Sequence, residues 1–295
     1  NNKANKQGGA VYTNQNSRLS INNCVFSNNI ADKGGAAYGG RNSDLKIHNS
    51  LFTLNKANIG GGSIFIDEGR ELNVNNCQFI NTTAGVDGGA IYGRTTITVM
   101  ESTFNHASSS IGSVCVIYSE KSSVSISGSK FIDTKANSGS GGAIFGYGAI
   151  SVLGSTFTDA RVKSEGGAIY GKSSVSVTNS TFKDTSANDG GAIYSNNDNI
   201  SVIGVSFKDT AASRNGGAIY GKSGTVSVTN SIFNNATANS GSGGAIFGYG
   251  AISATNSIFN NATANSGSGG VIFGYGAISV LDSTFTDARV KSEGG

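Results

Sequence analysis

A repeat of about 26 residues runs along the chain and restricts its fold more than any other feature. Copies of the motif Gly-Gly-Ala-Ile-Tyr and close variants begin at Gly8, Gly34, Gly61, Gly88, Gly141, Gly166, Gly190, Gly216, Gly243 and Gly269. A degenerate copy, Val114 to Tyr118, fills the one gap, and a last Gly-Gly begins at Gly294. The copies lie 24 to 27 residues apart, so eleven complete units run from Gly8 to Glu293. Self-similarity at such a period is typical of solenoids.

A column of phenylalanines follows the same period. Each unit has one aromatic residue at the end of the glycine motif and a phenylalanine 12 to 14 residues later. We predict that this second column is the core ladder of the fold: Phe26, Phe52, Phe79, Phe104, Phe131, Phe157, Phe182, Phe207, Phe233, Phe259 and Phe285. The two columns hold all fifteen phenylalanines, which leaves no phenylalanine for a separate core or a cofactor pocket. We therefore expect no cofactor.

Short strands with alternating burial are predicted before each core phenylalanine. In one unit Ile150 and Val152 flank Ser151, and most units repeat this apolar, polar, apolar order. A period of two with β-branched residues is typical of a half-buried strand. The Ala-Ile-Tyr stretch predicts a second strand, and runs such as residues 136–140 predict turns. The pattern indicates two or three strands per unit and no helix.

Such units cannot bury an apolar face alone but can do so when they stack on near-identical neighbours. The sequence therefore predicts an all-β protein, a parallel β-helix of about eleven coils that occupies residues 1–295 as a single repetitive domain. With a strand spacing of about 4.8 Å, the rod would be roughly 50 Å long. The facing of the first aromatic column stays open. If Ile91, Ile144 and Ile169 point inward, the tyrosine and phenylalanine ladder lies on the surface.

Composition excludes several classes of protein. Only 13% of the residues are charged and the net charge is +3, which provides no basic patch for nucleic acid. The chain has no run of about 18 apolar residues, so we expect no transmembrane segment. Proline is absent, as expected where every strand must donate hydrogen bonds to a neighbouring coil.

Two motifs at fixed spacing resemble a known repeat. Gly-Gly-Ala-Ile occurs at residues 88–91, 141–144 and 166–169, and Phe-x-x-Asn occurs at residues 26–29 and 52–55. This pair is similar to the repeat of the chlamydial polymorphic outer membrane proteins, although later units depart from Phe-x-x-Asn. The resemblance implies a right-handed β-helix that is extracellular or at the cell surface, with a role in adhesion or as the passenger of an autotransporter.

Near-exact duplication favours a structural role over catalysis. Residues 136–167 recur at residues 264–295 with two changes, a shift of five coils. An enzyme groove depends on a few coils that differ from the rest, whereas this chain repeats even its surface residues. Neither end has the polar cap that solenoids need. We therefore expect a segment of a longer rod, or a rod that continues end to end.

The function predicted from these patterns is that of a non-catalytic structural rod, a glycoprotein subunit of a surface fibre or stalk with an adhesive role. Its expected partners are further copies of the rod, glycans, and host or cell-surface ligands. A polysaccharide-active β-helix enzyme is one alternative. An ice-binding solenoid is another, because the outward serine column makes a regular hydroxyl face, although Leu153, Ile203 and Leu281 interrupt it.

Few residues offer site chemistry. An acidic column comprises Asp133, Asp159, Asp184, Asp209 and Asp287, which we interpret as turn residues; a cation bridging the carboxylates is the alternative. His48 and His106 fall in different columns, so we predict exposed side chains and no catalytic pair. Cys24 and Cys77 share the column two residues before phenylalanine, and with Cys115 we interpret them as small filling residues. No catalytic or metal-binding residue is predicted.

Asparagine sequons provide candidate modification sites. Candidate N-glycosylation sites are Asn81, Asn179, Asn199, Asn235 and Asn261. Three of them, Asn81, Asn235 and Asn261, share one turn column and are expected to be exposed.

Overall fold

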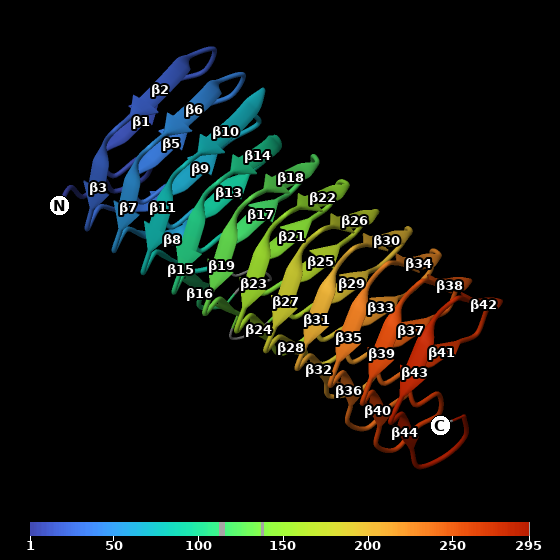
Figure 1. Ribbon diagram of the computed structural model, residues 1–295. Helices are drawn as coiled ribbons and strands as arrows, with labels where there is room; N and C mark the ends of the chain where they lie inside the picture. Colours follow the sequence, from blue (N-terminus) through green and yellow to red (C-terminus); the bar gives the residue numbers. More distant parts are fainter. Residues whose placement is uncertain (112–115, 137–138, 295) are drawn as a thin grey trace.

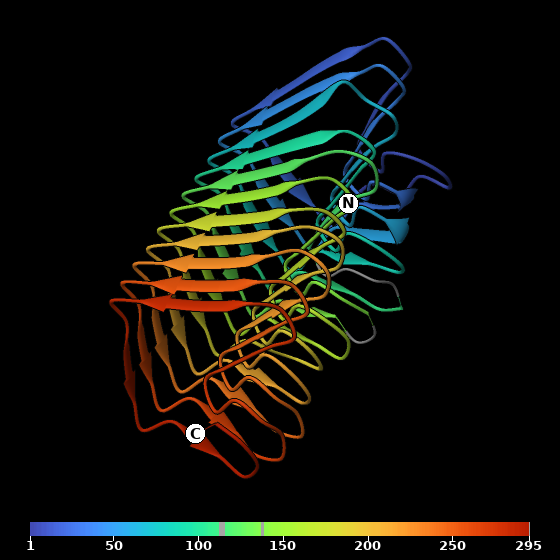
Figure 2. The same ribbon diagram turned by 90° about the vertical axis from the view of Figure 1, so that its right-hand side faces the viewer.

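The computed structural model describes residues 1–111, 116–136 and 139–294 as a solenoid with four short strands in each coil (Figure 1). Each strand pairs in parallel with the equivalent strand of the next coil, so the coils form four sheets of eleven strands over the described residues. The predicted all-β parallel β-solenoid is confirmed. Figure 2 shows the coils stacked along one axis, and Figure 1 shows the N-terminus and C-terminus at opposite ends of the stack.

The sheet that carries the first aromatic column is called the tyrosine sheet. Its strands are β1 (Val11–Thr13), β5 (Ala37–Gly39), β9 (Ile64–Ile66), β13 (Ile91–Gly93), β17 (Ile117–Ser119), β21 (Ile144–Gly146), β25 (Ile169–Gly171), β29 (Ile193–Ser195), β33 (Ile219–Gly221), β37 (Ile246–Gly248) and β41 (Ile272–Gly274).

The next sheet along each coil, the serine sheet, contains the predicted alternating strands. Its strands are β2 (Arg18–Asn22), β6 (Asp44–His48), β10 (Glu71–Asn75), β14 (Thr96–Met100), β18 (Val124–Ser127), β22 (Ile150–Leu153), β26 (Val175–Thr178), β30 (Ile200–Ile203), β34 (Val226–Thr229), β38 (Ile252–Thr255) and β42 (Ile278–Leu281).

The phenylalanine sheet follows. Its strands are β3 (Val25–Ser27), β7 (Leu51–Thr53), β11 (Gln78–Ile80), β15 (Thr103–Asn105), β19 (Lys130–Ile132), β23 (Thr156–Thr158), β27 (Thr181–Lys183), β31 (Ser206–Lys208), β35 (Ile232–Asn234), β39 (Ile258–Asn260) and β43 (Thr284–Thr286).

A fourth sheet, the short-strand sheet, corrects the expectation of two or three strands per coil. Its strands are β4 (Ile30–Lys33), β8 (Lys56–Gly60), β12 (Thr83–Ala84), β16 (Ser108–Ser109), β20 (Lys135–Ala136), β24 (Arg161–Val162), β28 (Ser186–Ala187), β32 (Ala211–Ala212), β36 (Thr237–Ala238), β40 (Thr263–Ala264) and β44 (Arg289–Val290). Most have two residues, too few to show a period of two in the sequence. The run 136–140, read as a turn, thus begins inside a strand, while Asn137 and Ser138 lie outside the described residues.

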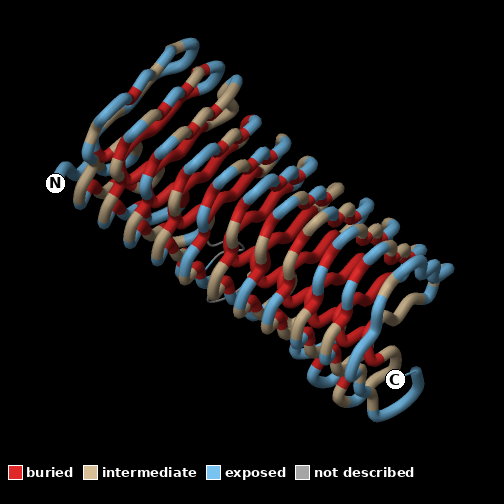
Figure 3. The backbone as a smooth tube through the Cα atoms, in the orientation of Figure 1, coloured by how far each residue is buried: buried red, intermediate tan, exposed pale blue. Residues whose placement is uncertain are grey.

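Buried residues lie along the inside of the stack (Figure 3). In this core, like residues lie on like residues. Phe79 pairs with Phe52 on one side and Phe104 on the other. Neighbouring rings of this ladder stack with centroids 4.5 to 5.1 Å apart. The side chains from Phe52 to Phe259 are fully buried, whereas Phe26 is half-buried and Phe285 is 42% exposed because each lies in an end coil.

The two glycines of the motif have different roles. Gly166 has a φ of +66°, the left-handed region that residues with a Cβ rarely adopt. Gly167 meets a packing limit instead, because an added Cβ would lie 2.0 Å from the carbonyl oxygen of Gly191 in the next coil. The motif therefore supplies both a tight corner and a close approach between coils.

Candidate functional site

The aromatic residues of the tyrosine sheet form a second ladder outside the main core. Ile91, Ile144 and Ile169 are fully buried and face the inside of the coil, so the neighbouring aromatic rings point outward. This settles the orientation that the sequence left open. The ladder is nevertheless only 2 to 9% exposed from Tyr38 to Phe247. Its rings stack with centroids 4.4 to 5.6 Å apart, so each covers the faces of its neighbours and leaves little more than an edge to solvent.

Burial keeps the phenols of this outer ladder neutral. It raises the pKa of Tyr38 to about 12, with a further contribution from the nearby Asp67 carboxylate. Burial also raises the pKa of Tyr194 and Tyr220 well above the ordinary tyrosine value. The phenols of these tyrosines are therefore uncharged at neutral pH.

An ion-pair cluster braces three coils beside this ladder. The Tyr92 hydroxyl donates a hydrogen bond to Glu120, and Arg94 pairs with Glu120 through Nε and with Asp67 through Nη1, the latter at 3.2 Å. One guanidinium thus pairs with both carboxylates. The cluster therefore links three coils through side-chain contacts.

Three tyrosines in the turn after the tyrosine sheet are exposed: Tyr147 by 46%, Tyr249 by 49% and Tyr275 by 66%. Tyr249 and Tyr275 lie in neighbouring coils, and their rings stack with centroids 4.8 Å apart and an interplanar angle of 13°. The equivalent neighbour of Tyr147 is Lys172, whose ammonium lies 5.9 Å from the Tyr147 ring centroid. The chain thus presents one exposed stacked tyrosine pair and one matched single tyrosine.

A serine ladder fills the inner corner between the serine and phenylalanine sheets. Ser155 is buried; its Oγ accepts the N–H of Ser129 at 3.1 Å and donates to the carbonyl of Leu153 at 2.9 Å. Cys24 and Cys77 occupy this column, and both are free thiols. The Cys77 Sγ lies 3.2 Å from the carbonyl of Asn75, in the role of a serine Oγ. The two cysteines therefore fill a small corner site; Cys115 lies outside the described residues.

The acidic column lies at the corner between the phenylalanine and short-strand sheets. Asp159, Asp184 and Asp209 have φ values of 54 to 56°, a conformation that aspartate and asparagine tolerate better than most residues. The turn interpretation is confirmed by this geometry. His106 belongs to the same column, and its Nε2 lies 2.8 Å from Asp133 Oδ2. The sequence offered a signal for this pairing, because His106 also lies two residues after a core phenylalanine.

Several carboxylates of the acidic column pair with basic side chains. Asp133 also pairs with Lys135, and Asp159 pairs with Arg161. Over residues 1–111, 116–136 and 139–294, no group of three or more His, Cys, Asp or Glu side chains could hold a metal ion. His48 is partly exposed on the serine sheet, away from His106. The part of the chain that the structure describes also has no helix that could cross a membrane.

The candidate glycosylation residues are all exposed, but their surroundings differ. Asn235 Nδ2 donates to Asp209 Oδ1 at 2.8 Å, and Asn261 Nδ2 donates to Asn235 Oδ1 at 2.9 Å. Asn199 Oδ1 accepts the N–H of Thr225. Asn81 and Asn179 lie at turn corners with positive φ. Glycosylation at these positions stays a prediction.

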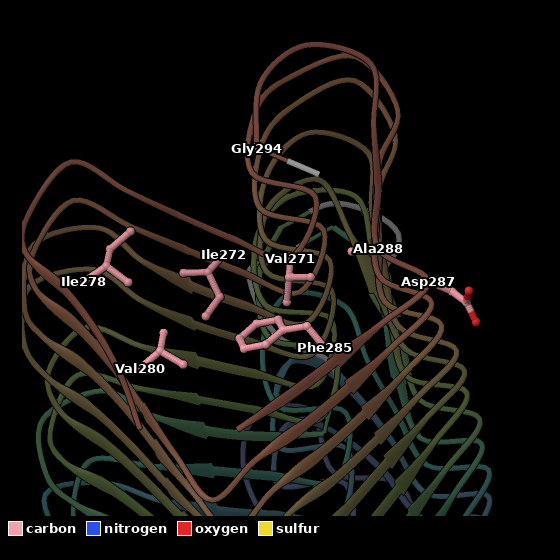
Figure 4. Close-up of a pocket in the computed structure, with 8 residues that line it drawn as sticks. All are labelled: Val271, Ile272, Ile278, Val280, Phe285, Asp287, Ala288 and Gly294. Atoms are coloured by element: carbon pink, nitrogen blue, oxygen red, sulfur yellow. The ribbon is translucent and has the colours of Figure 1, made fainter. Parts of the chain in front are cut away.

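The coil formed by β41 to β44 exposes a hollow of about 490 Å³ (Figure 4). The side chains of Ile278, Val280 and Phe285 line it, and Asp287 points away from it. Ile278, Val280 and Phe285 are 42 to 47% exposed, whereas the equivalent Ile150, Val152 and Phe157 are at most 1% exposed beneath the next coil. Elsewhere in the rod, the next coil covers the equivalent residues.

Comparisons with known proteins support the motif reading. No match was found among curated proteins, and none among solved structures. A family model matches the segment that contains Phe26 to Asn29 and the glycine motif at Gly34. The resemblance drawn from these motifs is thus confirmed: residues 23–40 match the Chlamydia polymorphic membrane protein (Chlamydia_PMP) repeat.

Proposed function

We propose that the chain is a non-catalytic rod that works outside the cell as a subunit of a surface fibre or stalk and adheres through its side faces. The repeat match and the solenoid support a surface-type β-helical protein. The observation that carries the proposal is the continuous strand pairing: all four sheets pass through eleven coils of the described residues, with one register shift, between β4 and β8.

Uniform coils favour a load-bearing role for a physical reason. Each coil contacts the coils directly above and below, so the stack behaves as a one-dimensional array of equal interfaces. The same two aromatic ladders run along the rod, with ring spacings close to the strand spacing. A rod of roughly 50 Å follows from eleven coils at about 4.8 Å each. Such an array extends in length without a change in cross-section.

A further coil of the same kind is the proposed cover of the face formed by β41 to β44. The occupant tested below is the coil formed by β1 to β4 of a second copy. The two faces present matching columns: Tyr12 would follow Phe273, and Phe26 would follow Phe285. Within the chain, the same kind of contact joins every coil to the next. A head-to-tail contact of this kind does not close and therefore generates a filament.

Electron microscopy and sedimentation over a range of protein concentrations test the proposal. The chain is expected to form filaments in multiples of one rod length, and Phe285→Asp is expected to prevent them by placing a charge in the contact. Thr284→Asp, on an exposed position of the same strand, is the matched control and should still assemble. Single rods at every concentration, or equal assembly of Phe285→Asp, would refute the assembly.

Adhesion and catalysis need separate assays. Immobilised wild-type rods are expected to retain a cell-surface glycan or protein ligand from a defined array without altering it. Turnover of any acidic or neutral polysaccharide by the purified chain would overturn the non-catalytic assignment and favour a polysaccharide-active enzyme.

A further inference from the structure

The exposed pair Tyr249 and Tyr275 has a geometry suited to a covalent modification. The two residues lie in the turns after β37 and β41, one coil apart, with ring centroids 4.8 Å apart and planes within 13° of parallel. Tyr249 has a coil on each side of it and is still 49% exposed. Both phenols are thus accessible from solvent while the coil register holds the rings together.

We propose that Tyr249 and Tyr275 are joined as dityrosine when a haem peroxidase acts on the rod with hydrogen peroxide. Each phenol loses one electron and one proton, and the two phenoxyl radicals form a carbon–carbon bond between the positions ortho to their oxygens. The hydrogens on those carbons then move as protons to the oxygens, which restores both hydroxyl groups. Hydrogen peroxide takes up the two electrons and two protons and leaves as two waters, so the protein loses two hydrogens.

Stacking in register favours coupling within the rod over coupling between rods. Both rings belong to one column of the same turn, so their equivalent carbons lie one above the other. Holding two reactants in such an arrangement replaces a bimolecular encounter with an intramolecular step. The pair therefore needs no second molecule to react.

Coupling requires two tyrosine rings that are close together and both exposed, and the other tyrosines meet only one of these conditions. The rings of Tyr170 and Tyr194 stack at 5.0 Å, but the residues are 5 to 6% exposed, so a peroxidase cannot reach them. Tyr147 is 46% exposed, but Lys172 occupies the next position of its column. Among the tyrosines of the described residues, closeness and exposure coincide at Tyr249 and Tyr275.

The test uses the full chain, dilute, with horseradish-type haem peroxidase and hydrogen peroxide. Trypsin releases the peptide Ser223–Arg289, which contains these two tyrosines and no others. This peptide is expected to lose two hydrogens and to give no fragment ions from breaks between residues 249 and 275. Dityrosine fluorescence should rise with the same time course.

Matched variants separate the proposal from general oxidation. Tyr249→Phe and Tyr275→Phe each keep the ring and remove one phenol, so the two-hydrogen loss should disappear, whereas Tyr147→Phe should leave it unchanged. Lys172→Tyr places a second phenol beside Tyr147 and should create a new linked pair in coils where none forms in the wild type. Circular dichroism of each variant checks that the fold is kept.

Three outcomes would overturn the proposal: an unmodified peptide while Tyr147 becomes oxidised, a two-hydrogen loss that persists in Tyr275→Phe, or dityrosine that forms only between molecules and rises with protein concentration. Each result is measured on single rods. Success or failure is therefore independent of whether the rods assemble into fibres.

Discussion

Phe157 provides the sharpest test of how the inner ladder stabilises the rod. Its ring is fully buried in the sixth coil and stacks at 4.8 Å on both Phe131 and Phe182. Phe157→Ala removes both ring contacts and leaves a cavity that the β-strands on either side cannot close, because their spacing is set by backbone hydrogen bonds. Phenylalanine-to-alanine changes in well-packed cores destabilise by about 3–5 kcal/mol, and we expect a value near the top of that range.

Phe285 is the matched control, because it belongs to the same column. It is 42% exposed and stacks on a single ring, Phe259. About half of its burial is therefore missing already, and Phe285→Ala should destabilise by about 2 kcal/mol, roughly half of the internal value. The difference in destabilisation between the two variants measures how much a phenylalanine ring gains when both of its faces are covered by neighbouring rings.

Urea denaturation followed by circular dichroism measures how far each variant lowers the free energy of unfolding. Hydrogen exchange shows which coils are destabilised. Exchange should accelerate most in the fifth to seventh coils of Phe157→Ala, because each coil depends on its immediate neighbours. In Phe285→Ala the acceleration should stay near β43. The reasoning is refuted if the two variants lose equal stability, or if Phe157→Ala loses less than about 1 kcal/mol, far below a normal core truncation.

Three further predictions concern other ladders. Ser155→Ala leaves the buried N–H of Ser129 without its acceptor, so the free energy of unfolding should fall by about 1–3 kcal/mol in urea denaturation, while Ser155→Cys should lose less. The pKa of Tyr38 is about 12 in the fold and about 10 in the unfolded chain, so its neutral phenol contributes stability that is complete below pH 10 and is lost as the pH rises towards 12. Tyr38→Phe removes this loss and should unfold at a higher pH than wild type in an alkaline circular-dichroism titration. In a host that N-glycosylates secreted proteins, glycopeptide mass spectrometry should find at most one of Asn235 and Asn261 modified per molecule, since the two side chains bond to each other one coil apart; molecules carrying both glycans would contradict this.

The fold could be predicted because each column repeats many times. One strand such as β22 has four residues and carries a weak signal alone, but eleven aligned copies make the inward and outward positions evident. The short-strand sheet could not be predicted in the same way. A strand such as β28 has two residues, and its serine and alanine also suit a turn. Its pairing depends on the three longer strands of the same coil, which place it opposite its neighbour.

The candidate sites show a similar division. The acidic corner was predictable from residue type, because aspartate and asparagine share a tolerance for positive φ. The burial of the outer tyrosine ladder was not, because the rings of Phe65 and Tyr118 cover the faces of the Tyr92 ring and the turn at Gly60 packs against it. Sequence alternation tells which side of a sheet a residue faces. It does not tell how closely identical residues shield one another.

The close approach at the second glycine of each motif has a consequence for how such a gene can change. The contact of Gly167 with the backbone of the next coil involves no side chain of that coil, so any coil that begins with two glycines satisfies it. Recombination that gains or loses one whole unit therefore leaves this backbone contact intact between the remaining coils, whereas a gain of half a unit would bring the wrong sheets together. The number of units in the gene therefore sets the length of the rod, which changes by one coil at a time while the cross-section stays the same.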